Sequence, residues 1–234
     1  LAYVRRLALT SLGWFSKYER LLIEPATDPD AYGINSQGDI VGSCFDSAGD
    51  IRGFLLHRGR YTILGGPHGA TEIDAYGINQ QGDIVGDYRD STGFVRGFLL
   101  HGGRYTTLVD PNGREDTGAT GINPQGDIVG QYVDSKSNHY GFLLHQGRYT
   151  TLNAPHATKG TYPWGINSQG DVVGYYLYGK LIEQGFLWHR GRYTTLTVPH
   201  GTDTAANGIN QQGDIVGDYS DSRGVPRGFL LRHG

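Results

Sequence analysis

Acidic and histidine side chains gather in five stretches of this chain, and a proline lies near the start of each. Carboxylate oxygens that converge from several stretches suit Ca²⁺, and a bound cation polarises a carbonyl group while a histidine acts as base. The predicted metal ligands are Asp30, Asp74, Asp116 and Asp203. The predicted catalytic residues are His68, His156 and His200. The chemistry expected from these residues is calcium-assisted hydrolysis.

Two plainer interpretations of these stretches stay open. Divergent surface connections are often polar without having any function. The three histidines also follow the same proline, so they can be one residue of an ancestral unit that the other two stretches have lost. Nothing in the sequence fixes the distances between their rings.

Aromatic side chains mark one region as a candidate substrate wall. Residues 178–183 read Tyr-Gly-Lys-Leu-Ile-Glu, where the corresponding segments elsewhere resemble Asp-Ser-x-Gly. Two of the three tryptophans, Trp164 and Trp188, lie in the same part of the chain. We therefore predict that Trp164, Tyr162 and Tyr178 bind a small-molecule ligand.

These residues sit on a repeated framework. The unit Gly-Ile-Asn-x-Gln-Gly-Asp-(Ile/Val)-Val-Gly begins at five positions with steps of 44, 44, 44 and 43 residues. Its copies begin at Gly33, Gly77, Gly121, Gly165 and Gly208. A fixed period of this length indicates an architecture built by repetition. We expect an extension over residues 1–16 and one domain over 17–234, with repeats that begin near 31, 75, 119, 163 and 206.

Each repeat contains four short segments with strand character. In the second copy they are Ala75–Asn79, Gly82–Tyr88, Arg96–His101 and Arg104–Leu108, and turn residues separate them. Four antiparallel strands in each repeat of about 40–45 residues predict an all-β, five-bladed β-propeller. A solenoid is the competing architecture. We prefer a ring closed by an N-terminal strand at about residues 17–22, because Lys-Tyr-Glu-Arg-Leu there resembles the Arg-Tyr-Thr-Thr-Leu strand that the last copy lacks.

The polar residues that repeat in every copy are expected to serve the scaffold. Asn and Asp of the repeated unit lie in one hairpin, where such side chains satisfy backbone donors. The connection between the fourth strand and the next first strand keeps its proline and otherwise diverges. In a propeller this connection leads from the outer rim to the innermost strand, so a single asymmetric site is predicted at the mouth of the central channel.

The sequence of the repeat resembles that of bacterial extracellular repeat proteins of the HAF type, which carry a Gly-Ile-Asn block followed by Gly-x-(Val/Ile)-Val-Gly. The His-Ala-Phe of that family is replaced here by Arg52-Gly53-Phe54 and its counterparts. The resemblance covers Tyr18 to the C-terminus. It implies a secreted or periplasmic location more than any activity.

Composition excludes several classes of protein. The net charge is -3 and no basic stripe exists, so nucleic-acid binding is not expected. No apolar run approaches the length of a membrane span. The single cysteine, Cys44, excludes an internal disulfide framework, and we expect its thiol to be at least half-buried. Residues 4–15 place two arginines before an apolar run, as the end of a secretion signal does. A monomer is expected.

Two classes of function remain. The first is a calcium-dependent hydrolase with its site at the channel mouth, acting on small cyclic esters such as N-acyl homoserine lactones. It is preferred by analogy with propeller lactonases, and because the sequence assigns neither a glycosidase acid pair nor a repeated aromatic platform for sugars. The second is a non-catalytic ligand-binding propeller, either lectin-like or a protein-interaction scaffold. The absence of a Gly-x-Ser-x-Gly motif keeps this alternative close.

Overall fold

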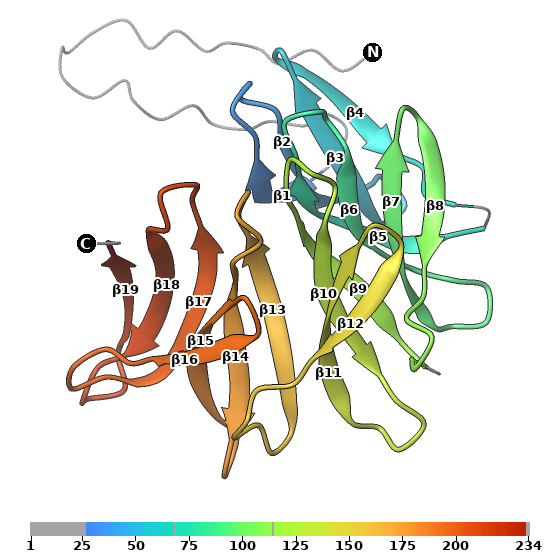
Figure 1. The fold of residues 1–234 in the computed structure, drawn as a ribbon. Coiled ribbons are helices and arrows are strands. Elements are labelled where there is room, and N and C mark those ends of the chain that lie inside the picture. Colours follow the sequence, from blue (N-terminus) through green and yellow to red (C-terminus); the bar gives the residue numbers. More distant parts are fainter. Residues whose placement is uncertain (1–26, 68, 114, 233–234) are drawn as a thin grey trace, which may run out of the picture.

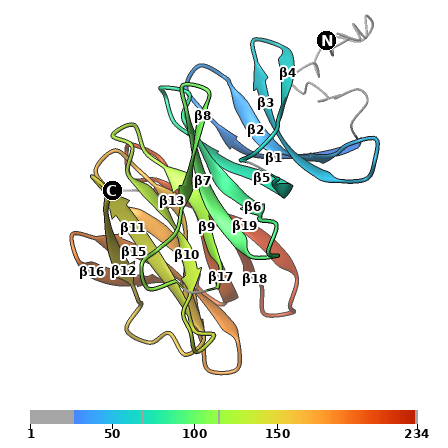
Figure 2. The same ribbon diagram turned by 90° about the vertical axis from the view of Figure 1, so that its right-hand side faces the viewer.

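The computed structural model describes residues 27–67, 69–113 and 115–232. This part of the chain forms nineteen β-strands and no helix (Figure 1). It is a five-bladed β-propeller: the sheets follow one another in chain order from blue to red, and every pair of neighbouring strands within a sheet is antiparallel (Figures 1 and 2). The predicted fold class is thus confirmed. None of the described residues forms a helix that is long and apolar enough to cross a membrane.

Four blades have four strands and the fifth has three among the described residues. Blade 1 comprises β1 (Thr27–Ile34), β2 (Ile40–Phe45), β3 (Ile51–His57) and β4 (Arg60–Leu64). Blade 2 comprises β5 (Thr71–Ile78), β6 (Ile84–Arg89), β7 (Val95–His101) and β8 (Arg104–Leu108). Blade 3 comprises β9 (Thr117–Ile122), β10 (Ile128–Val133), β11 (His139–His145) and β12 (Arg148–Leu152). Blade 4 comprises β13 (Gly160–Ile166), β14 (Val172–Tyr178), β15 (Ile182–His189) and β16 (Arg192–Leu196). Blade 5 comprises β17 (Thr202–Ile209), β18 (Ile215–Ser220) and β19 (Pro226–Leu231).

The first strand of several blades begins earlier than the sequence suggests. In blade 2 the prediction begins at Ala75, whereas β5 begins at Thr71. The extra residues include a register shift between Thr71 and Ile73, and Glu72 inside it has a positive φ of 49°. A β-bulge of this kind admits an extra polar residue into a strand. Asp74, expected in a connecting loop, therefore lies within β5.

The repeated Asn and Asp residues build one turn and join the blades. Asn123 Oδ1 accepts hydrogen bonds from the backbone N–H groups of Gln125 (3.0 Å) and Asp127 (2.8 Å). Its Nδ2 donates across the blade boundary to the backbone oxygen of Asn167 at 3.2 Å. Equivalent inter-blade bonds leave Asn35, Asn79 and Asn167. The scaffold role expected for these residues agrees with this geometry.

The core lies between the blades because each sheet presents apolar side chains on both faces. Phe54, Phe98, Phe142 and Phe186 are all fully buried. In each complete blade the tyrosine of the fourth strand packs against this phenylalanine, with ring centroids 5.2–5.5 Å apart. Cys44 is buried as expected, and burial raises the pKa of its thiol.

The seam between blade 5 and blade 1 differs from the other blade boundaries. Val41, Val85, Val129 and Val173 are fully buried, whereas the equivalent Val216 of blade 5 is 49% exposed. On blade 1, Ile34 is 68% exposed, although its counterpart Ile78 is only 8% exposed. The extension at residues 1–16 and the closing strand predicted at residues 17–22 lie outside the described residues.

Candidate functional site

A pocket of about 300 Å³ opens between blades 2 and 3. Blade 2 contributes side chains from β5, β6 and the start of β7. Blade 3 contributes them from β10, from the residue before β9 and from the start of β11. Its polar and aromatic lining residues are Glu72, Asp74, Tyr76, Asp87, Tyr88, Arg89, Asp116, Gln131, Tyr132 and His139. The volume is at the lower end of the range of roughly 300–1,000 Å³ found for small-molecule sites.

Two carboxyl groups of this pocket are neighbours on one sheet. Asp74 on β5 lies directly opposite Asp87 on β6 in the strand register. Residues opposite each other in an antiparallel pair point to the same face, with Cβ atoms about 4.5–5.5 Å apart. Asp116 adds a third carboxyl group from blade 3, and its Oδ1 accepts a hydrogen bond from the backbone N–H of Val95 at 2.8 Å. The pocket is therefore rich in hydrogen-bond acceptors.

A glycine makes room for Asp87. A Cβ atom on Gly118 of β9 would lie 2.8 Å from Asp87 Oδ2, closer than real Cβ contacts allow. The equivalent positions hold Asp30, Asp74, Tyr162 and Ala205 in the other blades. Only in blade 3 does a glycine leave this space against the neighbouring blade. The Asp87 carboxyl therefore occupies space that the side chain at the position of Gly118 would fill in the other blades.

Electrostatics favour the protonated form of Asp87. Burial, together with the negative charges of Asp74 and Asp116, raises its pKa to about 7, and the positive charge of Arg89 opposes this rise. Burial also raises the pKa of Asp74, and Glu72 adds to the rise, while a hydrogen bond from Ser43 counteracts it. At neutral pH the pocket thus offers a carboxyl group that can donate as well as accept a hydrogen bond.

Asp87 and Gln131 offer polar side chains in the pocket that are available to a ligand. Among the described residues, none forms a hydrogen bond with the side chain of Asp87 or of Gln131. Arg89 is engaged, because it pairs with Glu72 at 2.7 Å and donates to the backbone oxygen of Gly93 at 2.8 Å. The Tyr132 hydroxyl is likewise bonded to Thr151 Oγ1 at 3.1 Å. Asp87 and Gln131 are therefore free polar groups of the site, and the side chains of Tyr76 and His139 likewise form no hydrogen bond among the described residues.

The four predicted calcium ligands lie in different places. Asp74 and Asp116 line the pocket, whereas Asp30 is exposed on β1 and Asp203 lies on β17. Asp203 Oδ1 accepts a hydrogen bond from the backbone N–H of Glu183 at 3.4 Å. The described part of the chain contains no group of three or more His, Cys, Asp or Glu side chains that could hold a metal ion.

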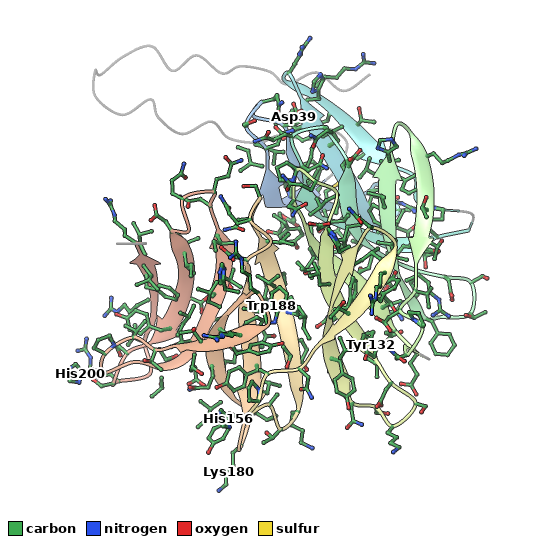
Figure 3. The ribbon with its side chains drawn as sticks, in the orientation of Figure 1. Asp39, Tyr132, His156, Lys180, Trp188 and His200 are labelled. Carbon is green, nitrogen blue, oxygen red and sulfur yellow. The ribbon has the colours of Figure 1, made fainter. Side chains whose placement is uncertain are left out.

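The predicted catalytic histidines do not meet in the described residues. His156 and His200 are exposed on the connections β12–β13 and β16–β17. Figure 3 shows His156 and His200 well apart at the edge of the molecule. Asp39, which belongs to the repeated Asn and Asp turn of blade 1, lies toward the opposite end. His68 lies outside the described residues.

The predicted aromatic residues are also divided among several positions. Trp164 lies on β13 and contacts Tyr76 of blade 2, with ring centroids 6.3 Å apart. Tyr162 stacks on Tyr175 at 5.0 Å within blade 4. Tyr178 is 50% exposed at the end of β14. Trp164 thus contacts the pocket residue Tyr76, and Tyr162 contacts the pocket residue His139, with ring centroids 5.7 Å apart.

Sequence reasoning missed Asp87, Gln131 and Gly118. A signal for the first two exists in the repeat itself. The residue that follows the last glycine of the unit differs in every blade except for a shared aspartate in blades 2 and 5: it is Ser43, Asp87, Gln131, Tyr175 or Asp218. This variable position lies inside a nearly invariant strand, and a position-by-position comparison of the copies would have marked it.

Histidine–aspartate pairs outside the pocket repeat from blade to blade. His57 Nδ1 lies 2.7 Å from Asp39 Oδ1, and the pair of His101 with Asp83 measures 2.6 Å. His145 with Asp127 and His189 with Asp171 complete the set in blades 3 and 4. Each pair joins the third strand to the turn of the repeated Asn and Asp residues in its own blade, so these pairs belong to the scaffold.

Comparison with known proteins finds similarity in structure alone. No protein-family profile matches the sequence, and no curated protein does. Among solved structures, a triple arginine-to-alanine mutant of AofleA from Arthrobotrys oligospora superposes with a TM-score of 0.55 at 12% identity, over 88% of this chain and 72% of the other. A fucose-specific lectin from Aleuria aurantia gives a TM-score of 0.54 at 12% identity, over 87% and 73% of the two chains. Another structure of Aleuria aurantia lectin, described as a six-bladed β-propeller with a novel mode of fucose recognition, gives 0.52 at 11% identity over 86% and 73%.

These similarities define the class of protein as a β-propeller. At identities of 11–12% they establish the fold and nothing finer. The HAF-type and bacterial assignment, like the secreted location, stays a prediction.

Proposed function

We propose that this propeller binds carbohydrate, and that one neutral sugar unit occupies the pocket between blades 2 and 3. The observation that carries the proposal is the pair of free polar groups, Asp87 and Gln131, which face one pocket from neighbouring blades. Of the two functions expected from the sequence, this is the lectin-like alternative.

The chemistry of the lining suits a polyhydroxylated molecule. Sugar hydroxyl groups both donate and accept hydrogen bonds, so they pair with carboxyl and amide groups alike. The C–H face of a sugar is apolar and packs on aromatic rings such as those of Tyr76 and Tyr132, which line the same pocket. Three neighbouring aspartates disfavour an anionic ligand, because its charge would add to theirs.

The structurally similar propellers support this choice of ligand. One of them, Aleuria aurantia lectin, is described in two structures by its recognition of fucose, and the present pocket lies on a fold of the same kind. Fucose therefore belongs in the first set of ligands to be tested, together with other neutral methyl glycosides.

Titration calorimetry with a panel of neutral methyl glycosides tests the proposal. The wild-type protein should bind at least one of them. Asp87→Asn should weaken that binding about tenfold or more, because a hydrogen bond to a charged or ionisable group contributes roughly 1.5–3 kcal/mol. Asp218→Asn is the matched control, since Asp218 holds the equivalent position in blade 5 and bonds Asn207 at 2.6 Å. Failure of every neutral sugar to bind, or equal loss in both variants, would overturn the proposal.

A calcium-dependent lactonase is the second candidate. It keeps one specific observation in its favour, since two of the four predicted ligands, Asp74 and Asp116, line the same pocket. Thermal unfolding with EDTA and then with added Ca²⁺, followed by hydrolysis of an N-acyl homoserine lactone at constant pH, tests this candidate. A calcium-dependent rise in melting temperature and turnover that Asp74→Asn abolishes would favour it over sugar binding.

A further inference from the structure

The first strand of every blade carries a bulge at one equivalent residue. The strand register in blade 2 passes from Ala75 directly to Gly77 and leaves Tyr76 unpaired. The same shift occurs in the other four blades. The unpaired residues are Tyr32, Tyr76, Thr120, Trp164 and Asn207. A bulge redirects a side chain away from the regular pleat, and bulges recur beside functional sites.

This bulged position varies while its neighbours repeat. It holds four residue types in five copies, although the Gly-Ile-Asn sequence that follows is invariant. The five first strands also contact one another in succession, from β1 through β5, β9 and β13 to β17. The bulged residues therefore lie at one equivalent position on five neighbouring strands.

Three of these residues form one aromatic cluster. The ring of Tyr76 lies 5.3 Å from that of Tyr32 and meets Trp164 edge-on at 6.3 Å and 87°. The contact between Tyr76 and Trp164 joins blade 2 to blade 4. Blade 3 lies between them but contributes no ring, because its bulged residue is Thr120. The Thr120 hydroxyl donates a hydrogen bond to the backbone oxygen of Pro163 at 2.8 Å. We name Tyr32, Tyr76 and Trp164 the axial aromatic cluster.

The cluster is accessible and adjoins the sugar pocket. Trp164 is 37% exposed and Tyr32 is 48% exposed, so aromatic surface is available to a ligand. Tyr76 belongs to both regions, because it lines the pocket with Asp74 and Asp87 and also contacts both other rings of the cluster. An apolar group attached to a sugar in the pocket can thus extend past Tyr76 onto Trp164.

We propose that the axial aromatic cluster binds an aromatic aglycone, so that the preferred ligand of this propeller is an aryl glycoside. This inference rests on the proposed function for the sugar part. The cluster favours a planar ring, because exposed aromatic side chains offer a partner offset-stacked or edge-on contacts. Such contacts should make binding of a phenyl glycoside about threefold to tenfold tighter than binding of the matching methyl glycoside.

The test compares phenyl and methyl glycosides of the sugar selected by the panel. Trp164→Thr installs the residue type that blade 3 carries at the same position. It should remove the phenyl advantage, which is the tighter binding of the phenyl glycoside relative to the methyl glycoside. The affinity for the methyl glycoside should stay within about twofold of the wild-type value. Trp188→Phe is the control, because Trp188 packs against the core between blades 3 and 4. It should keep the full advantage, and its fluorescence should still be quenched by the phenyl glycoside through Trp164.

The failure of this inference differs from the failure of the proposed function. Equal affinity of the wild-type protein for both glycosides, or a phenyl advantage that survives in Trp164→Thr, overturns the aglycone site while sugar binding stands. If Trp164→Thr does not fold, Tyr32→Ser removes another exposed ring of the cluster and must lower the phenyl advantage instead. If no glycoside binds, phenol alone tests the cluster: quenching of Trp164 supports an aromatic site, and its absence overturns the inference.

Discussion

At the scale of single residues, the site depends on positions where the repeat changes. Asp87 faces blade 3 where the other copies carry Ser, Gln, Tyr or Asp, and Gly118 leaves the space that its carboxyl group occupies. Both changes lie inside strands that otherwise repeat. One blade boundary has thereby gained a pocket with free polar groups while the scaffold stays the same.

The raised pKa of Asp87 predicts how stability depends on pH. Its pKa is about 7 in the folded protein and 3.8 in the reference state, so the unfolded chain ionises first as the pH rises. The contribution of Asp87 is fully present below about pH 3.8 and is lost as the pH rises through about 7. Asp87→Asn should therefore stabilise the protein at pH 8, by on the order of 1–4 kcal/mol, with the gain vanishing near pH 4.

Urea denaturation at pH 4, 6 and 8 measures this difference, with Asp218→Asn as control. The groups that face Asp87 are Asp74 and Asp116, which raise its pKa, and Arg89, which opposes them. An Asp87→Asn gain that is constant with pH would contradict the assignment of the titration to Asp87.

At the scale of elements, the repeated turn joins one blade to the next. Asn123 makes the same contacts within its turn as Asn210, but only Asn123 also donates a hydrogen bond to the following blade in the described residues. Asn123→Ala should lower the free energy of unfolding by about 1–3 kcal/mol. Asn210→Ala should lower it less, because this substitution removes no inter-blade hydrogen bond. Thermal unfolding of the two variants measures the difference, and equal losses would show that the inter-blade bond adds nothing.

Packing between blades gives a second prediction at this scale. Leu152 is 1% exposed in the core between blades 3 and 4, whereas Leu230 of β19 is 53% exposed. Leu152→Ala should cost about 2–5 kcal/mol through the cavity it creates. Leu230→Ala should change the free energy of unfolding by no more than about 0.5 kcal/mol. A comparable loss in both variants would mean that residues outside the described part of the chain cover β19.

At the scale of the whole molecule, the repeat makes the fold predictable. Five copies of one unit specify five blades, and turn residues at fixed places specify where strands end. The pocket was harder to predict because it depends on register. Bulges inside the first strands move Asp74 out of a loop and opposite Asp87, and a pattern of residue types does not reveal such shifts. Trp164 was predicted to bind a ligand, and its contact with Tyr76 shows how it adjoins the pocket.

A crystal structure with the methyl glycoside selected by calorimetry tests the central claim most directly. We predict the sugar between β6 and β9, with Asp87 and Gln131 both within hydrogen-bonding distance of its hydroxyl groups. A sugar bound instead at the exposed connections that carry His156 and His200, or at every blade boundary alike, would contradict the claim that the pocket between blades 2 and 3 is the site.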